Sequence, residues 1–371
     1  MEKAVIVGVF QKSDDFRLCE VEELAKNSGY LIVDKVVQIR RGPHASYLIG
    51  PGKLQELKER LKKYGVKTVL FANELKPGQY FRLQKELGLD VNILDRVLLI
   101  LDVFDKRAST SEAKLQIELA RLKYTLPWAR ELVRLKGFGS EKMGFGSLGG
   151  YPYKVYISFA RKRIKAIEEK LERLRRRQEE VVIRRKEVSL PIVALTGYTQ
   201  SGKTTLFNLL TKESKVTGLG PFTTLETCAR RVDAYGKSFI VVDSLGFIDE
   251  MPQLVLDAFH ATLIELKLAD AITLLVDASE TPSSIERKLK TALSIISEVA
   301  GNDKPLIVAV NKIDLIGDSR LEKTIKLVKK VVAHCNIVPI SAKKAINIGF
   351  LLKRIVEELQ NAESKPYLNP S

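Results

Sequence analysis

The sequence predicts an α/β protein. We expect a C-terminal domain on a mostly parallel, doubly wound sheet, and a small N-terminal α/β domain that carries a long antiparallel helical hairpin. Three observations predict this class. Short β-branched runs alternate with helical stretches in both terminal parts of the 371-residue chain, apolar residues in the middle recur at steps of three and four, and a glycine-rich stretch divides that middle segment.

Residues 1–110 predict the small N-terminal sheet. Its strand-like runs are KAVIVGVF, GYLIVDKVVQI, KTVLFAN and VNILD, and its helix-like stretches are KLQELKERLKKYG and QYFRLQKELG. Strands that are joined through helices pair in parallel. The GPGK stretch at residues 50–53 lacks the glycine spacing and the hydroxyl residue of a phosphate loop, which favours a turn that enters a helix.

Residues 111–187 predict the hairpin. The first arm has its apolar positions at Leu115, Leu119, Leu122, Leu126, Ala129 and Val133, and the second at Ile157, Ala160, Ile164, Ile167, Leu171, Leu174, Gln178 and Val181. Such spacing is typical of a coiled-coil seam. The glycine-rich residues 137–152 allow the chain to reverse. We expect the second arm to run from about Tyr153 to Lys186, roughly 50 Å, and Pro127 to kink or interrupt the first.

Basic residues are concentrated in this hairpin. The chain carries a formal net charge of +16, and its segment from Arg121 to Lys186 holds 19 basic and 7 acidic residues. A charge excess confined to one segment favours a polyanionic partner such as nucleic acid. The alternative is a solvated helix face without a partner.

Residues 188–360 predict the larger sheet, and residues 361–371 a tail. The strand-like runs LPIVALTG, SFIVVD, AITLLVDA, PLIVAVNK and NIVPIS have helical stretches between them. In doubly wound sheets of this kind, ligands bind outside the carboxyl ends of the strands. Candidate site residues are therefore expected where these runs end.

A phosphate-binding loop follows the first of these strands. The stretch GYTQSGKT matches the pattern G-x-x-x-x-G-K-T in the required position between a strand and a helix. Its backbone N–H groups can surround phosphates, Lys203 can supply charge to the β and γ groups, and the Thr204 hydroxyl can bind Mg²⁺. The predicted nucleotide-binding residues here are Gly197, Tyr198, Thr199, Gln200, Ser201, Gly202, Lys203, Thr204 and Thr205.

The stretch NKID indicates which base is bound. The Asp314 carboxylate can accept hydrogen bonds from the ring N–H and the exocyclic amine of guanine, a pair of donors that adenine lacks. The alternative for N-x-x-D is a simple Asx turn at a strand end. The stretch SAK follows the next strand and can close over the base. The predicted base-binding residues are Asn311, Lys312, Asp314, Ser341, Ala342 and Lys343.

Two further stretches predict a nucleotide-dependent switch. In VVDSLGF, Asp243 is placed at a strand end, from which it can reach Mg²⁺ through water. The backbone N–H of Gly246 can approach a γ-phosphate. The loop TGLGPFTTLET carries Phe222, Thr223 and Thr224, and we expect Thr224 to bind Mg²⁺ only when the γ-phosphate is present. The predicted metal ligands are Thr204, Thr224 and Asp243, and the predicted catalytic residues are Lys203, Thr224 and Gly246.

These motifs resemble those of the translation-factor-related GTPases, and the chain from residue 3 to 360 resembles the HflX family. The resemblance is carried by YLIGPGKLQEL, LDVFDKRASTSEAKLQIELARLKY, GYTQSGKTTLFNLLT, FTTLET, DSLGFIDEMP, NKID and SAK. It implies a Mg²⁺-dependent GTPase that binds GTP and GDP, binds the large ribosomal subunit with its ribosomal RNA, and can split ribosomes. The glycine-rich stretch departs from the G-P-G-E-T-Q-L-E sequence of many relatives, so no contact residues are transferred to it.

Phe247 predicts slow intrinsic GTP hydrolysis. Many switch GTPases have a glutamine at this place to orient the attacking water, although the family resembled here is also apolar there, and a phenyl ring cannot orient water. We therefore expect a partner to stimulate the reaction. Two alternatives stay open at this point: an ATP-driven nucleic-acid remodeller, and a nucleotide-gated binding module with negligible hydrolysis. Competition of ATP against labelled GDP separates the first of these from a GTPase.

The remaining composition favours a cytoplasmic protein, the family resemblance implies that it is ribosome-associated, and we expect a monomer. The longest apolar runs fall short of the ~20 residues that span a bilayer, and the N-terminus lacks the cleavage site of a secretory signal. The three cysteines and three histidines are scattered singly, which indicates neither a disulfide framework nor a zinc site. Whether the cellular role is ribosome splitting, rescue or assembly is left open.

Overall fold

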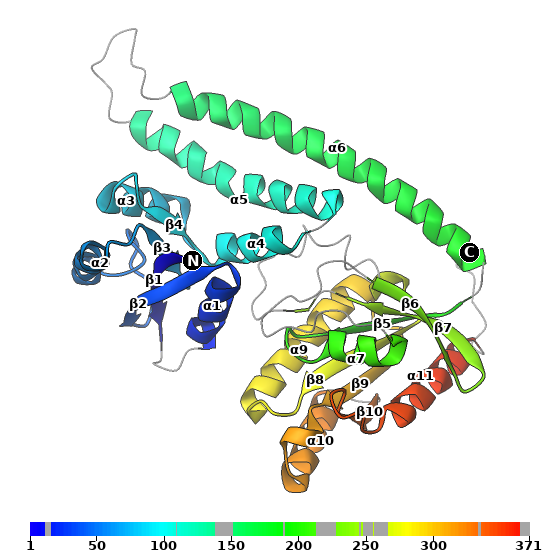
Figure 1. Cartoon of the computed structure of the whole chain (residues 1–371). Helices are drawn as coiled ribbons and strands as arrows, with labels where there is room; N and C mark the ends of the chain where they lie inside the picture. The colour runs from blue at the N-terminus through cyan, green and yellow to red at the C-terminus, as the bar shows by residue number, and fades with distance from the viewer. Residues whose placement is uncertain are drawn as a thin grey trace. The chain divides into compact units, whose positions relative to one another are not determined.

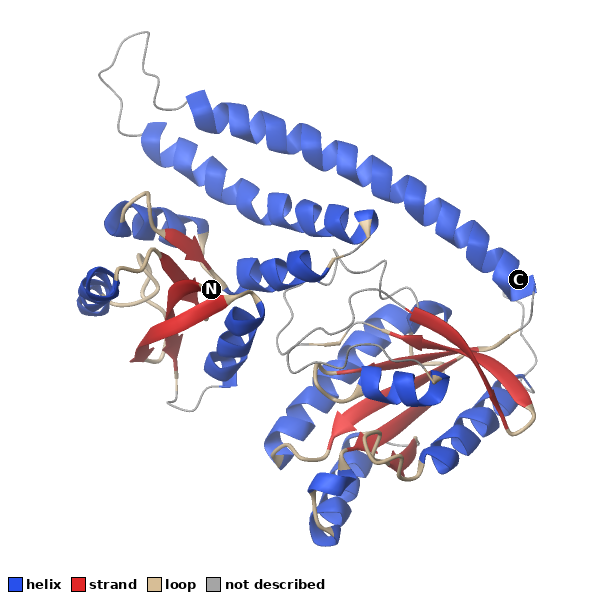
Figure 2. Cartoon of the chain, in the orientation of Figure 1, coloured by secondary structure: helices blue, strands red, loops and turns tan. Residues whose placement is uncertain are grey.

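The chain divides into two compact units, residues 1–174 and residues 175–371, and each unit contains its own β-sheet (Figures 1 and 2). The computed structural model describes residues 1–11, 16–108, 110–137, 151–187, 190–212, 228–244, 246–247, 255, 266–332 and 335–363. Within these residues, no helix has the length and apolarity that a membrane crossing requires. Nor do they contain a cluster of His, Cys, Asp and Glu side chains that could hold a metal ion.

The N-terminal unit contains a four-stranded parallel sheet with strand order β2-β1-β3-β4. Its strands are β1 (Glu2–Phe10), β2 (Tyr30–Ile39), β3 (Thr68–Phe71) and β4 (Asn92–Leu94), and its helices are α1 (Phe16–Asn27), α2 (Pro51–Tyr64), α3 (Pro77–Leu87) and α4 (Arg96–Arg107). Strand β1 is buried from Ala4 to Phe10, as expected for a central parallel strand covered on both faces. The predicted small parallel sheet is confirmed. The GPGK stretch forms the turn into α2, whose first residue is Pro51.

Helices α5 (Ser111–Gly137) and α6 (Tyr151–Glu187) form the hairpin and run antiparallel (Figure 1). Arg163 makes two hydrogen bonds of 2.6 and 2.7 Å to the carboxylate of Glu118, and the Lys123 ammonium lies 2.7 Å from a Glu168 oxygen. Most side chains of α6 between the predicted seam positions are exposed. Six of the seam positions themselves are buried or half-buried: Ile157, Ala160, Ile164, Ile167, Leu171 and Leu174.

Of the predicted kink or interruption at Pro127, the interruption does not occur, because helix α5 continues through this residue; the kink stays a prediction. Tertiary packing next to the proline accounts for this. The indole of Trp128 stacks on Tyr80 of α3 with the ring centroids 4.1 Å apart, and it meets Tyr124 edge-on at 5.1 Å. Packing of this kind offsets the loss of one backbone hydrogen bond and the low helix propensity of proline.

A buried carboxylate connects the hairpin to the N-terminal sheet. Asp95 caps the start of α4 by accepting hydrogen bonds of 3.0 Å from the backbone N–H groups of Leu98 and Leu75, and it also accepts one from the Tyr124 hydroxyl. The side chain is fully buried. Burial raises the pKa of this carboxyl group to about 6, against the lowering effect of its hydrogen-bond donors.

The C-terminal unit contains a six-stranded sheet with strand order β10-β9-β8-β5-β7-β6. All neighbouring strands are parallel except β6 and β7. The strands are β5 (Ile192–Gly197), β6 (Cys228–Ala234), β7 (Lys237–Asp243), β8 (Ala271–Asp277), β9 (Leu306–Asn311) and β10 (Asn336–Pro339). Strand β6 is not among the predicted strands. It joins β7 through Tyr235 and Gly236, which have φ values of 49° and 75° and so suit a tight hairpin turn.

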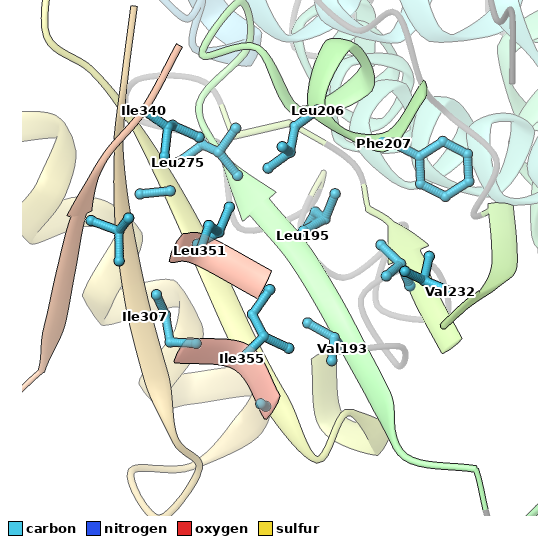
Figure 3. Close-up of a cluster of buried hydrophobic side chains, with 14 of the residues drawn as sticks. Val193, Leu195, Leu206, Phe207, Val232, Leu275, Ile307, Ile340, Leu351 and Ile355 are labelled. Carbon is cyan, nitrogen blue, oxygen red and sulfur yellow. The ribbon is translucent and has the colours of Figure 1, made fainter. Parts of the chain in front are cut away.

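Helices cover both faces of this sheet, as the doubly wound class requires. They are α7 (Lys203–Thr211), α9 (Pro282–Ala300), α10 (Asp318–Val331) and α11 (Ile348–Glu363). On one face, side chains of α7 and α11 pack with Val193 and Leu195 of β5 (Figure 3). On the other, Leu289 of α9 and Val328 of α10 are buried against the sheet. Because β5, β8 and β9 are parallel neighbours, they end at one common edge.

Candidate nucleotide-binding site

The loop from Gly197 to Lys203 connects β5 to α7 at this edge. Gly197, Gln200 and Gly202 have φ values of 138°, 65° and 98°. A Cβ atom at Gly197 would lie 2.4 Å from the carbonyl oxygen of Leu275, and one at Gly202 would lie 2.2 Å from Nδ2 of Asn311. At Gly197 and Gly202, only glycine combines such backbone angles with these close contacts. The loop thus packs closely against β8 and β9.

Lys203 occupies the centre of the loop. Its ammonium donates hydrogen bonds to the carbonyl oxygens of Gly197 at 2.9 Å and Tyr198 at 2.7 Å. Burial lowers the pKa of this amine to about 8, and the negative charge of Asp243 opposes the shift. A phosphate that approached the loop would supply the negative charge that a buried ammonium needs.

Thr204 and Asp243 form a buried hydroxyl–carboxylate pair beside the loop. Thr204 Oγ1 donates to Oδ2 of Asp243 at 3.1 Å, and both residues are buried. Thr204 lies in the first turn of α7, and Asp243 ends β7. Carboxylate and hydroxyl oxygens are ligands of the kind that Mg²⁺ prefers, so this donor set fits that ion. The predicted third ligand, Thr224, lies outside the described residues with its neighbours Phe222 and Thr223.

The chain after β7 pairs with the loop. The Thr199 N–H donates to the carbonyl of Phe247 at 2.8 Å, and the Phe247 N–H donates to the carbonyl of Gly197 at 3.0 Å. Gly246 lies close to the loop, because a Cβ there would lie 2.9 Å from Nζ of Lys203 and 3.2 Å from Cα of Thr199, so a side chain would have to displace these groups. The Phe247 ring is buried and meets the Tyr198 ring edge-on at 6.3 Å. This phenyl group therefore belongs to the core.

Asn311 links two loops through its side-chain amide. Its Nδ2 donates to the carbonyl of Ser201 at 2.8 Å, and its Oδ1 accepts from the backbone N–H of Ala342 at 2.9 Å. The side chain is buried. One amide therefore fixes the phosphate loop relative to the SAK stretch.

Asp314 lies beside the SAK stretch in a short 3₁₀ helix, Ile313–Leu315. Its Oδ1 accepts a hydrogen bond of 2.6 Å from the Ser341 hydroxyl, which itself accepts one from the Lys344 N–H at 3.1 Å. The carboxylate is half-buried, and Lys343 is exposed. The serine thus orients a carboxylate at the position where the base-binding group is expected.

Sequence reasoning missed Asp277. This residue ends β8, and its Oδ2 accepts from Nζ of Lys312 at 2.5 Å. Lys312 has a φ value of 67°, so the ion pair helps to hold a backbone conformation that few non-glycine residues adopt. Asp277 could have been predicted from its place near the end of the apolar run AITLLVDA. In the sheet it lies at the same edge as Asn311, with which it pairs.

The structure brings the described candidates together at the carboxyl edge of the larger sheet. They are Gly197, Tyr198, Thr199, Gln200, Ser201, Gly202, Lys203, Thr204, Thr205, Asp243, Gly246, Asn311, Lys312, Asp314, Ser341, Ala342 and Lys343. A buried lysine, a hydroxyl–carboxylate pair and an oriented carboxylate in one place suit the binding of a phosphorylated ligand that also presents hydrogen-bond donors.

Three family models match consecutive parts of the chain. They are described as GTP-binding GTPase N-terminal, which matches residues 15–105, GTP-binding GTPase Middle Region, residues 107–185, and 50S ribosome-binding GTPase, residues 192–312. Two solved structures are similar over almost the whole chain. A GTP-binding protein of Sulfolobus solfataricus in complex with GDP is 27% identical, with a TM-score of 0.51 over 97% of this chain and 99% of that one. A complex of SsGBP with GDP is also 27% identical, with a TM-score of 0.55 over 98% of this chain and 100% of that one.

Curated relatives that carry the name GTPase HflX are similar in sequence. The protein of Thermococcus kodakarensis is 39% identical over 91% of this chain and 77% of its own length. That of Thermofilum pendens is 39% identical over 96% of this chain and 82% of its own length. Given these matches and the geometry of its phosphate loop, the chain belongs to the HflX family, and it is a GTPase.

Proposed function

We propose that this GTPase binds the large ribosomal subunit through its basic hairpin, and that the bound guanine nucleotide controls this binding. The observation that carries the proposal is the exposed basic surface of α6. Among the side chains of α6 that the structure describes, seven basic ones are exposed: Arg161, Lys162, Arg163, Lys165, Lys170, Arg173 and Arg176. The family model that matches residues 192–312 is described as a 50S ribosome-binding GTPase, which supports the choice of partner.

The same helix surface exposes apolar side chains near the hairpin end. Phe159 is 62% exposed and Val155 is 51% exposed. Lysine and arginine side chains that contact RNA phosphates release counterions, so binding through them weakens as salt rises. An exposed phenyl ring adds a surface on which an unpaired base can stack. The combination fits ribosomal RNA better than a solvated helix face, because solvation alone does not account for an exposed aromatic side chain among cations.

For the hydrolytic site we propose in-line attack of water on the γ-phosphate. Lys203 and the loop N–H groups stabilise the charge that develops on the phosphate oxygens, and the Gly246 N–H contacts the γ-phosphate. Mg²⁺, when bound through Thr204, Asp243 and Thr224, would neutralise charge on the β and γ groups. Because the Phe247 ring is buried in the core, it cannot orient water. We therefore infer slow intrinsic hydrolysis that is stimulated when the ribosome orders the switch residues.

Pelleting with purified large subunits tests the proposal. The variant carries Lys162→Glu and Lys165→Glu, two exposed residues of α6 for which no ion pair is found in the described part of the chain. With a non-hydrolysable GTP analogue, the wild type should pellet and the variant should not, and the wild type should pellet less with GDP. Its binding should also fall steeply as salt rises.

The matched control carries the same charge change on α10, at the exposed residues Lys329 and Lys330. It should pellet like the wild type. Equal pelleting of the hairpin variant and the wild type at every salt concentration would contradict the role of the hairpin. Equal pelleting with GDP and with the analogue would contradict nucleotide control.

A further inference from the structure

A second exposed surface lies on the C-terminal unit, where the β6–β7 turn meets the start of α11. We call Tyr235, Ile346 and Phe350, together with the lysines beside them, the aromatic–lysine patch. These three side chains are 60%, 40% and 46% exposed. The Tyr235 hydroxyl donates to the carbonyl of Gly349 at 3.0 Å, which joins the turn to the helix. None of the three contributes to the buried cores of the sheet.

The patch carries a positive charge. Lys343, Lys344 and Lys353 are exposed, and among the residues that the structure describes none of them forms an ion pair. The Arg354 guanidinium lies over the Phe350 ring at 5.0 Å from its centroid and pairs with Glu357 at 2.6 Å. The arginine thus supports the aromatic ring, and the three lysines supply the excess charge.

We propose that the aromatic–lysine patch binds unpaired bases of RNA, with Phe350 and Tyr235 as stacking surfaces and the lysines as phosphate contacts. The proposal rests on the proposed function only in taking RNA as the partner. Every base has a flat π-face, so exposed aromatic rings interleaved with cations suit single-stranded RNA. An acidic protein segment would satisfy the lysines but would leave the two ring faces without a matching group.

The patch adjoins the loop that is expected to close over the guanine. Ile346 exchanges backbone hydrogen bonds of 3.2 and 3.0 Å with Ser341, whose hydroxyl bonds Asp314 at 2.6 Å. RNA on the patch would therefore contact the segment that orients the base-binding carboxylate. No residue of the hairpin is needed for this contact, which makes the two RNA surfaces separable by mutation.

Fluorescence anisotropy tests the proposal with the full-length, GDP-loaded protein and a labelled oligouridylate of about 12 nucleotides. All proteins carry the Lys162→Glu and Lys165→Glu changes, so that the hairpin contributes little. Phe350→Leu, which keeps bulk without an aromatic face, should weaken binding about ten-fold. Phe350→Tyr should bind like its parent, Lys353→Glu should bind more weakly, and the control Lys329→Glu should not. Each variant must retain the GDP affinity of the parent, which shows that it is folded.

Three results would overturn the proposal: unchanged binding by Phe350→Leu, equal binding of a fully paired duplex, or equal competition by an acidic peptide. None of them depends on subunit pelleting. If the hairpin variant fails to pellet while Phe350→Leu still binds the oligonucleotide, the patch proposal fails and the proposed function stands. If the hairpin variant pellets normally while oligonucleotide binding requires Phe350, the reverse holds.

Discussion

Replacing Asn311 with alanine removes the amide that joins the phosphate loop to the SAK stretch. Two buried backbone groups lose their partner, the carbonyl of Ser201 at 2.8 Å and the N–H of Ala342 at 2.9 Å. Each unpaired group costs about 1–3 kcal/mol when water cannot reach it. In the free protein both loops can relax toward water, whereas a bound nucleotide holds them in place, so most of the cost should appear as lost affinity.

Taking about 3 kcal/mol for the pair, the Kd for GDP should rise on the order of 100-fold. Isothermal titration of GDP in the presence of magnesium measures it. The control is Asn347→Gly, which removes a hydrogen bond of 2.9 Å from the Asn347 side chain to the carbonyl of Pro339 at an exposed site. Residue 347 has a φ value of 59°, which glycine adopts readily. It should change the Kd by less than about three-fold. A similarly small change for Asn311→Ala in folded protein would refute the linking role of the amide.

Three more predictions concern single groups. The pKa of Lys203 is lowered to about 8 and a bound phosphate raises it, so each GDP bound at about pH 8.5 should be accompanied by the uptake of about 0.75 proton. Calorimetric titrations in buffers of different ionisation enthalpy measure this uptake. The variant Lys203→Met should abolish it. Gly202→Ala would place a methyl group 2.2 Å from the Asn311 amide, so GDP titration should detect no binding by protein whose circular dichroism is native. Asp95 has a folded pKa of about 6, above its ordinary 3.8, so the folded state binds more protons than the unfolded state between these two pH values. The free energy of unfolding should therefore fall by on the order of 3 kcal/mol as pH rises from 4 to 7. Urea unfolding followed by the fluorescence of Trp128, the only tryptophan, should show this pH dependence in the wild type and not in Asp95→Asn.

The sequence was sufficient to predict the parallel strands of both sheets and the edge where the candidate residues meet, because parallel strands put their carboxyl ends at one edge. The residues that end β5, β7 and β9 were found in this way. The direct bond between Asn311 and Ser201 could not be predicted. It spans β8, which lies between β9 and β5, and so it depends on strand order and register.

Other differences have local causes. Strand β6 carries charged residues at exposed edge positions, so it lacks the apolar run by which the other strands were recognised. The continuity of α5 through Pro127 depends on the contacts of Trp128 with α3, and such tertiary packing is not visible in helix propensity. The predicted Mg²⁺ site includes Thr224, which lies outside the described residues, so that ligand stays a prediction.

The proposed preference for guanine nucleotides depends on Asp314. Titrating GDP and xanthosine diphosphate into wild type and Asp314→Asn tests it directly, because asparagine replaces one acceptor oxygen with a donor, and xanthine presents a carbonyl where guanine has its amine. We predict that the wild type prefers GDP by a large factor and that the variant reverses the preference. A variant that still binds GDP as tightly as the wild type does would contradict the assignment of Asp314 as the base-binding residue.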